Sequence, residues 1–390
     1  MRLCIDASNL RAGGGVTHLQ ELLRRATPGE FGFEQVVVWA SAATLSRLED
    51  RPWLVKKTDP ALERNYLVRA LWQRRTLGRL AADDRCDLLY VPGGSFATTF
   101  RPIVTMSRNM LPFEPAELRR FGLSAMGLKM LLLRWTQPIS MRRADGTIFL
   151  TRYARDTVLR TIGAVAGQVS IIPHGIDERF ALSIKPQQPR AGYSNAHPFR
   201  FVYVSTVDVY KHQIEVAEAV AMLRDEGRPV ALDLIGPAYA PSLAALRKSL
   251  DQLDPDATFI RYLGPVPYAS LQVSYASADA AVFASSCENM PNILLEKMAA
   301  GLPIACSDRG PMPEMLGEAG LYFDPDSSVS VAACLRRLLD SPELRSRLAK
   351  AAQQRAAPYS WDRCARETLS FLAVVARRRI AVGSKADSCA

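Results

Sequence analysis

Short apolar runs alternate with longer stretches of helical periodicity along the whole chain. Most of the runs are apolar at every position, which is typical of strands in a parallel sheet that is covered on both faces. The predicted strands are residues 3–5, 35–39, 88–91, 103–106 and 147–150 in the first half, and residues 169–172, 201–204, 231–235, 259–262, 281–283, 304–306 and 321–323 in the second. Two successive arrays of strands and helices predict two doubly wound α/β domains.

The domain boundary is expected where the pattern is interrupted. A chain of 390 residues is too long for one ordinary core. Residues 185–197 are rich in Pro, Gly, Gln and Asn, which favours a loop. We therefore expect an N-terminal domain over residues 1–168 and a second domain over 169–365. Residues 366–390 are predicted to form a C-terminal helix and tail for which the N-terminal domain offers a packing surface.

Composition narrows the functional class. The net charge of +10 is explained either by solubility or by an anionic partner such as a nucleotide, a nucleic acid or a membrane surface. Aromatic residues are not interleaved with basic residues on a strand platform, so no nucleic-acid partner is expected. The first residues, 1–6, have the character of a strand, and no run reaches the ~18 apolar residues of a spanning helix. These features predict a cytoplasmic protein.

The cysteines predict neither a disulfide framework nor a zinc site. They are scattered without a C-x-x-C pair, which suits a reducing compartment. The seven are Cys4, Cys86, Cys287, Cys306, Cys334, Cys364 and Cys389.

A pair of glutamates carries the strongest functional signal. Glu288 follows the predicted strand 281–283, and Glu296 lies eight residues further on. In a continuous helix this spacing is about 11–12 Å, too long for one metal ion but close to the length of a sugar-diphosphate-ribose unit. A helix N-terminus between the two would attract the diphosphate. The alternative is two surface glutamates on an ordinary helix.

The residues around this pair resemble glycosyltransferase family 4, whose hallmark is an E-x7-E segment. The similarity includes Ala-Ser-Ala-Asp before the strand, Ala-Gly-Leu-Pro after the helix, and the stretch from Gly310 to Asp324. It covers most of residues 165–365 closely and the first half loosely.

This resemblance implies a GT-B fold, in which two Rossmann-like domains face each other across a cleft, and hexosyl transfer with retention. Glu288 would contact the transferred hexose, and Glu296 would bind the ribose hydroxyls. We predict Glu288, Lys211 and Arg108 as catalytic residues. The predicted donor-binding residues are Gly14, Gly15, His174, Ser205, Thr206, Lys211, Gly264, Glu288, Asn289, Met290, Pro291, Asn292, Leu295 and Glu296.

Lys211 is expected to bind the leaving diphosphate because it follows the predicted strand 201–204. Family members have an arginine about five residues earlier, whereas this chain has Ser205 or Thr206 there. A hydroxyl or a cation from elsewhere must replace that contact. The alternative for Lys211 is a solvated lysine.

Three further features have both a functional and a structural interpretation. Gly13 to Gly15 follow the first strand and could cradle a phosphate, although the spacing is not that of a dinucleotide fingerprint. His174 could contact the donor or pack at a hinge. Arg108 stands where many relatives carry His-Asp, and it is either an electrostatic clamp or part of a structural loop.

No metal or other cofactor is expected. Asp254-Pro-Asp256 and Asp324-Pro-Asp326 resemble a metal-binding Asp-x-Asp motif, but turn and helix-capping chemistry explains them better.

The predicted partners are a nucleotide diphosphate sugar and a glycan or polyprenyl-linked acceptor of bacterial surface polysaccharide synthesis, with GDP-mannose or a UDP-hexose as donor. The basic and apolar stretch 119–143, with Trp135, could touch an anionic membrane at its inner face, or it could be an ordinary amphipathic helix. Two alternative functions remain: a sugar-nucleotide 2-epimerase of the same fold and a basic nucleic-acid-binding protein.

Overall fold

The structure, a computed structural model, describes residues 1–11 and 13–387, with residues 379–387 described as backbone. Cys389 lies outside the described residues. The chain forms two units. The first comprises Met1–Phe113, Leu123–Gly175 and Tyr359–Ala390, and the second comprises Glu114–Gly122 and Ile176–Pro358. Among the described residues, no helix has both the length and the apolar character needed to cross a membrane.

The first unit contains a seven-stranded parallel sheet in the order β3-β2-β1-β4-β5-β6-β7. Its strands are β1 (Arg2–Asp6), β2 (Gln35–Trp39), β3 (Leu54–Lys57), β4 (Leu88–Val91), β5 (Ile103–Met106), β6 (Gly146–Phe149) and β7 (Gln168–Ile171). The central strands β4, β5 and β6 are buried at every position, as their continuous apolar runs predict.

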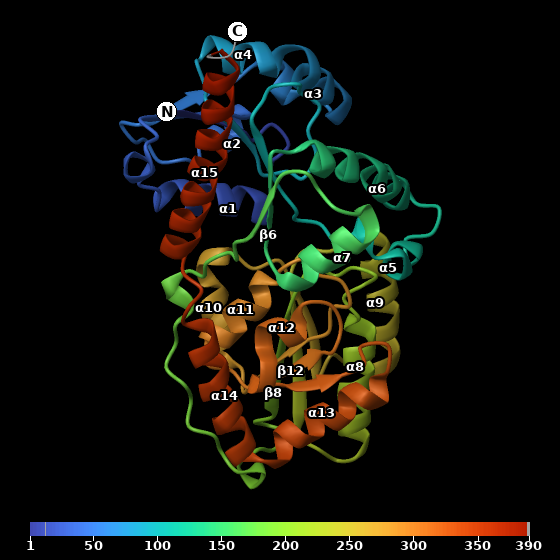
Figure 1. Cartoon of the computed structure of the whole chain (residues 1–390). Coiled ribbons are helices and arrows are strands. Elements are labelled where there is room, and N and C mark those ends of the chain that lie inside the picture. Colours follow the sequence, from blue (N-terminus) through green and yellow to red (C-terminus); the bar gives the residue numbers. More distant parts are fainter. Residues whose placement is uncertain (12, 388–390) are drawn as a thin grey trace. The chain divides into compact units, whose positions relative to one another are not determined.

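The helices of this unit cover the sheet. They are α1 (Gly14–Arg24), α2 (Ala42–Leu45), α3 (Tyr66–Trp72), α4 (Gly78–Asp83), α6 (Ala125–Arg143), α7 (Arg152–Ile162) and α15 (Trp361–Asp387). The long helix α15, drawn in red in Figure 1, packs against α1 and β4, so the C-terminal segment is part of the first unit.

The second unit contains a six-stranded parallel sheet in the order β10-β9-β8-β11-β12-β13. Its strands are β8 (Phe199–Val204), β9 (Val230–Ile235), β10 (Ile260–Gly264), β11 (Ala280–Phe283), β12 (Ile304–Ser307) and β13 (Leu321–Phe323). Its helices are α5 (Pro115–Arg119), α8 (Gln213–Asp225), α9 (Ala240–Leu253), α10 (Leu271–Ser277), α11 (Asn292–Ala299), α12 (Met312–Leu316), α13 (Ser328–Asp340) and α14 (Pro342–Ala356). Both sheets have the doubly wound order, which confirms the predicted α/β architecture.

Three details differ from the sequence-based prediction. The pattern missed β3, an edge strand of sequence LVKK whose lysines hide its strand character. Strand β7 belongs to the first sheet, whereas the predicted boundary at residue 168 placed it in the second domain. Residues 114–122, within the predicted N-terminal domain, belong to the second unit. An apolar run shows that a strand exists, but it does not show which sheet the strand joins.

Gly175, the last residue of the segment Leu123–Gly175, lies very close to the backbone of Ser360 and Trp361. A Cβ atom at this position would lie 2.1 Å from the backbone nitrogen of Trp361 and 2.4 Å from the carbonyl carbon of Ser360. Both atoms belong to the Ser360–Trp361 backbone, which cannot yield as a flexible side chain could.

We therefore expect Gly175→Ala to lower the free energy of unfolding by about 3 kcal/mol, the upper part of the range for overpacking. The measurement is urea denaturation followed by circular dichroism. Gly29→Ala is the matched control because a Cβ atom there meets nothing within 4 Å. Equal stabilities of the two variants would contradict the proposed close approach.

Candidate active site

The strand order of the second unit reverses at β8. Strands β8 and β11 are neighbours in the sheet, although β9 and β10 lie between them in the sequence. Such a switch point opens a crevice beyond the carboxyl ends of the strands, and ligands bind there in doubly wound proteins. Lys211 lies on the loop that follows β8, and Glu288 lies on the loop that follows β11. The topology thus brings the two predicted catalytic residues of this unit together.

Lys211 and Glu288 form an ion pair through Nζ and Oε1. The Lys211 side chain is 8% exposed and the Glu288 side chain is 18% exposed. Burial opposes the charged form of Lys211, but the Glu288 carboxylate and the nearby Tyr210 and Tyr203 outweigh it and raise the lysine pKa. Lys211 is therefore a permanent cation at this crevice and not a solvated surface lysine.

Glu288 does not lie on a helix. Helix α11 begins at Asn292 with Pro291 as its N-cap, so Glu288 lies on the loop ahead of it. The spacing estimated for a continuous helix between Glu288 and Glu296 does not apply to this segment. Asn292 and Ile293 head the helix, where backbone N–H groups lack carbonyl partners within the helix and favour an anion.

Glu296 lies in the middle of α11 and is 4% exposed. Tyr275 donates a hydrogen bond of 3.0 Å to its Oε2 atom. Burial raises the pKa of Glu296 to about 7, although hydrogen bonds from Tyr275 and Tyr268 act in the opposite direction. A carboxyl group that is half ionised near neutral pH, with ring hydroxyls aligned on it, is a polar group of the kind expected at a binding site.

Lys297 lies on α11 and is fully buried. Its ammonium donates to the carbonyl oxygens of Val282 at 2.8 Å and Val204 at 3.3 Å. These residues lie near the carboxyl ends of β11 and β8, beyond the last paired residues Ala281 and Val202. Lys297 therefore joins the two strands where their ladder stops.

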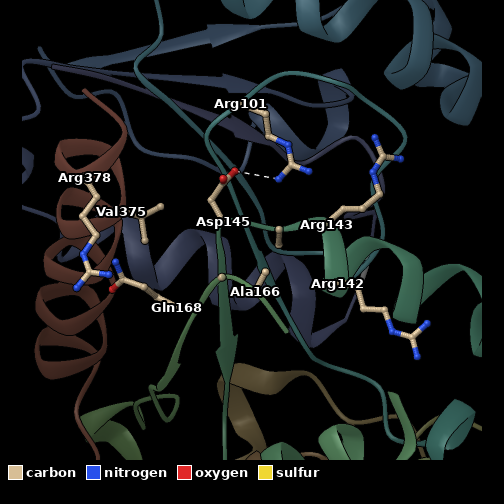
Figure 2. Close-up of a pocket in the computed structure, with 10 residues that line it drawn as sticks. Arg101, Arg142, Arg143, Asp145, Ala166, Gln168, Val375 and Arg378 are labelled. Carbon is tan, nitrogen blue, oxygen red and sulfur yellow. Dashed lines mark hydrogen bonds and ion pairs between the residues drawn. The ribbon is translucent and has the colours of Figure 1, made fainter. Parts of the chain in front are cut away.

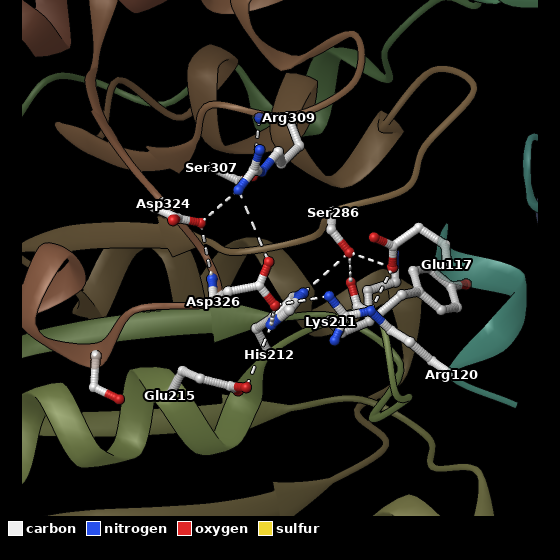
Figure 3. Close-up of polar contacts among 12 residues, drawn as sticks. Glu117, Arg120, Lys211, His212, Glu215, Ser286, Ser307, Arg309, Asp324 and Asp326 are labelled. Carbon is white, nitrogen blue, oxygen red and sulfur yellow. Dashed lines mark hydrogen bonds and ion pairs between the residues drawn. The ribbon is translucent and has the colours of Figure 1, made fainter. Parts of the chain in front are cut away.

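A polar network surrounds the Lys211 loop (Figure 3). The Ser286 hydroxyl donates to Glu117 at 2.7 Å, and its oxygen lies 3.0 Å from Nε2 of His212. Arg120 pairs with Glu117 at 2.9 Å and with Asp326 at 2.7 Å. Glu117 and Arg120 come from residues 114–122, so this segment is fixed to the loops that carry Lys211 and Glu288.

The remaining predicted donor-site residues of this unit differ in their exposure to solvent. Ser205 is 3% exposed, whereas Thr206 is exposed and lies on the Lys211 loop. Gly264 ends β10 with a φ of +71°. Met290 is 7% exposed and Leu295 is fully buried, so a donor contact from Leu295 would have to come from its backbone. Asn289 is 6% exposed on the loop before α11.

In the first unit, Gly14, Gly15 and Arg108 lie together. A Cβ atom on Gly15 would lie 3.1 Å from Nη1 of Arg108, and one on Gly14 would lie 3.8 Å from Nη2. Helix α1 begins at Gly14, and Arg108 follows the carboxyl end of β5. The guanidinium thus lies directly against a helix N-terminus, and the two together attract an anion. Burial lowers the pKa of Arg108, while nearby Tyr90 opposes the shift.

His174 lies in the first unit and is 3% exposed. Its Nδ1 atom is 2.9 Å from Nδ1 of His18, and its ring centroid is 5.7 Å from that of Trp361. These contacts lie within the first unit, and the donor contact of His174 stays a prediction.

Within the described part of the chain, His18, His174 and Cys364 are the group whose ligand atoms lie close enough to hold a metal ion, all within 4.8 Å of one another. Burial lowers the pKa of both imidazoles, as does the Arg108 cation. Burial also raises the pKa of Cys364 to about 12, which keeps the thiol protonated. The absence of a metal from catalysis stays a prediction.

The two Asp-Pro-Asp segments have structural partners. Asp254 accepts hydrogen bonds from the backbone N–H groups of Thr258, Phe259 and Ile260. Asp324 and Asp326 pair with Arg309, and Ser327, not Asp326, caps α13.

Sequence reasoning missed several residues that shape this site. Tyr268, Tyr275 and Lys297 read as members of an ordinary apolar pattern, and Ser286 and Glu117 lie far apart in the chain. The one local signal is Lys297, a charge at a position where the α11 pattern is otherwise apolar.

The burial of Lys297 gives a testable pH dependence. Burial lowers its pKa to about 7, against an ordinary value of 10.5. Between these values the unfolded chain binds one more proton than the folded chain, so the free energy of unfolding rises with pH. We expect Lys297→Met to remove a slope of up to about 1.4 kcal/mol per pH unit between pH 7 and 10. Urea denaturation across this range measures the slope.

Lys350→Met is the control for this prediction because Lys350 is exposed on α14. It should keep the wild-type slope. A Lys297→Met variant with the same slope as wild type would show that Lys297 titrates like a solvated lysine.

Comparison with known families covers most of the chain. A family model described as "Glycosyltransferase Family 4" matches residues 12–180, and one described as "Glycosyl transferases group 1" matches residues 185–355. The O-antigen chain mannosyltransferase B of Escherichia coli is 27% identical over 223 residues, which cover 57% of this chain and 56% of that protein. This chain spans about half the length of the curated relatives that it matches.

Solved structures agree over the whole fold. The Anabaena protein HepE, in complex with UDP and glucose, superposes with a TM-score of 0.66 at 17% identity, covering 99% of this chain and 100% of that one. WaaG, a glycosyltransferase involved in lipopolysaccharide biosynthesis, gives a TM-score of 0.69 at 14% identity, covering 95% and 99%. The two family models, together with the GT-B architecture of two doubly wound domains, show that this chain belongs to glycosyltransferase family 4.

Proposed function

We propose that this protein transfers a hexosyl group, with retention, from a nucleotide diphosphate sugar to a glycan or polyprenyl-linked acceptor in bacterial surface polysaccharide synthesis. The observation that carries the proposal is the arrangement at the β8/β11 switch point, where Lys211, Glu288, the N-terminus of α11 and Glu296 occur in one unit. The resemblance to a mannosyltransferase favours GDP-mannose, and HepE, crystallised with UDP and glucose, keeps a UDP-hexose as the other candidate.

Each group has a defined part in donor binding. The diphosphate accepts hydrogen bonds from Lys211 and from the N–H groups at the start of α11. Glu288 accepts from sugar hydroxyls, and Glu296 accepts from the ribose hydroxyls. Arg108 with Gly14 and Gly15 offers a further site for anionic groups in the first unit.

The reaction needs no covalent enzyme intermediate. The bond between the anomeric carbon and the β-phosphate oxygen breaks while the acceptor oxygen bonds to the same face of that carbon. The acceptor proton passes to the departing phosphate. Lys211 and the helix N-terminus stabilise the charge that builds on the diphosphate, so no metal cofactor is required.

We expect Glu288→Gln and Lys211→Met each to lower kcat about 100-fold, the scale of losing one preorganised electrostatic contact.

Glu296→Gln should raise KM about 10-fold with a smaller change in kcat, because it weakens one charged hydrogen-bond acceptor in donor binding. Donor affinity should also tighten in the wild type as pH rises through about 7, where Glu296 ionises. Glu296→Gln should lose this dependence. Radiolabelled GDP-mannose and UDP-glucose, with released nucleotide and product separated by chromatography, provide the readout.

Glu343→Gln is the matched control because Glu343 is an exposed glutamate of α14. It should behave as wild type, and addition of EDTA should leave turnover unchanged. Conversion of the donor to an epimeric sugar nucleotide without acceptor would instead indicate a 2-epimerase. Full turnover of Glu288→Gln would contradict the assigned site.

We further propose that the outer face of α6 contacts an anionic membrane. Leu128, Leu131, Leu132, Trp135 and Ile139 recur at helical spacing and are 46–73% exposed. Such a contiguous apolar stripe is uncommon on a soluble surface. Lys129 is exposed beside it, and Arg142 and Arg143 end the helix, so the charge suits acidic lipids.

Trp135→Ser should weaken binding to phosphatidylglycerol vesicles about 10-fold, since one large apolar side chain no longer enters the lipid interface. Cosedimentation measures this, and Val329→Ser, at an exposed apolar residue of α13, is the control. Equal binding by both variants, or equal binding to phosphatidylcholine, would exclude α6 as an anionic-membrane surface.

A further inference from the structure

A basic pocket lies at the amino ends of three strands in the first unit. Arg101 precedes β5, Asp145 precedes β6, and Gln168 begins β7. In a parallel sheet all amino ends lie at one edge, whereas Gly14, Gly15 and Arg108 follow carboxyl ends at the other edge. The pocket is therefore separate from the predicted phosphate site of this unit.

Arginines dominate the lining of this pocket. Its four guanidinium groups belong to Arg101, Arg142, Arg143 and Arg378, and Asp145 is its one carboxylate. Figure 2 shows Arg378 reaching in from α15, while the other three arginines lie on the far side of Asp145 in this view. The lining thus carries an excess of three positive charges within a volume of about 510 Å³.

The single carboxylate of the pocket, that of Asp145, already has hydrogen-bond partners. Asp145 Oδ2 accepts from Arg101 Nη1 at 2.9 Å and from the backbone N–H of Ile103 at 2.8 Å. Arg142 donates from Nε to the carbonyl oxygen of Ile162 at 2.9 Å, which fixes that side chain. Among the described residues no hydrogen bond or ion pair holds the exposed guanidinium of Arg143, and Arg378 interacts with a neutral amide, that of Gln168. Arg142, Arg143 and Arg378 therefore face no carboxylate in this pocket, and of these three only Arg142 is fixed by a carbonyl oxygen.

The floor of the pocket is kept open by small residues. Ala144, Ala166 and Gly167 line it, so no long side chain fills the space between the arginines. Gly167 lies so close to the Ala144–Asp145 backbone that a Cβ atom would be 2.3 Å from the Ala144 carbonyl oxygen. This approach holds the loop before β7 against the start of β6 and fixes the position of Gln168 opposite Asp145.

We propose that this pocket binds a phosphate-bearing anion. Guanidinium groups present paired N–H donors that match phosphate oxygens, and a ligand with several phosphate oxygens can bind Arg143 and Arg378 at once. The volume falls within the range of small-molecule sites and exceeds the needs of one phosphate ion, so the ligand is a diphosphate or an organic phosphate. Its source is either a free phosphorylated molecule or the headgroup of a phosphorylated lipid. The proposal does not depend on the glycosyltransferase activity.

The test is isothermal titration of the full chain with inorganic pyrophosphate at low salt. Arg143→Ala and Arg378→Ala should each weaken one binding event about 10-fold, as expected for the loss of one charge-assisted contact. Arg143→Lys should give an intermediate loss, because the charge stays but the paired donors are gone. Arg79→Ala, at an exposed arginine of α4, and Lys211→Met should leave this event unchanged.

Phosphatidic acid vesicles separate the two sources. Vesicle binding that both arginine substitutions weaken, and that pyrophosphate competes away, assigns the pocket to a lipid headgroup. Vesicle binding that neither substitution changes, with pyrophosphate binding still weakened, assigns it to a free phosphorylated molecule. The proposal is overturned if Lys211→Met abolishes all pyrophosphate binding, or if Arg143→Ala and Arg378→Ala bind pyrophosphate as tightly as wild type does while keeping the wild-type melting temperature.

Discussion

The bridge from Lys297 to the ends of β8 and β11 is the constraint on which the candidate site depends. Neighbouring strands at a switch point must separate because their connections leave in opposite directions. Here the paired residues stop at Val202 and Ala281, and the buried ammonium then bonds the carbonyl oxygens of Val204 and Val282. The crevice therefore opens beyond a fixed point. A buried lysine is costly, as its lowered pKa shows, and its position explains why this one is useful.

The two principal charges of the candidate site, Lys211 and Glu288, form an ion pair with each other. Lys211 and Glu288 are largely buried and neutralise one another. If the donor binds as proposed, its diphosphate replaces Glu288 as the partner of Lys211, and its sugar hydroxyls donate hydrogen bonds to Glu288. An ion pair in a poorly hydrated site tolerates the loss of one partner badly. A donor that supplied only a phosphate or only a sugar would leave one charge unsatisfied, and this favours ligands that carry both.

The sequence was sufficient for the architecture and for the principal acidic residues, but not for the contacts that tune them. Continuous apolar runs identify the buried parallel strands, and residues that follow such strands converge because the strands are parallel. That logic places Lys211 and Glu288 at the same edge of the sheet, and the pairing of β8 with β11 makes them neighbours. The sequence also predicts that a helix begins between Glu288 and Glu296, and α11 begins there at Asn292. It cannot show that Tyr275 and Ser286 meet Glu296 and Glu117, since those contacts join separate elements.

A parallel sheet has two chemically distinct edges, and the first unit places basic groups at both. At the carboxyl edge, Arg108 lies against the glycines that begin α1, so the cation and the helix N-terminus reinforce each other. At the amino edge the arginines face strand starts and the end of α6, where the helix dipole is negative and cannot help to bind an anion. An anion there must be held by side chains alone, which accounts for the larger number of arginines at the amino edge. The net charge of +10 is thus partly concentrated where the backbone offers the least attraction to phosphate.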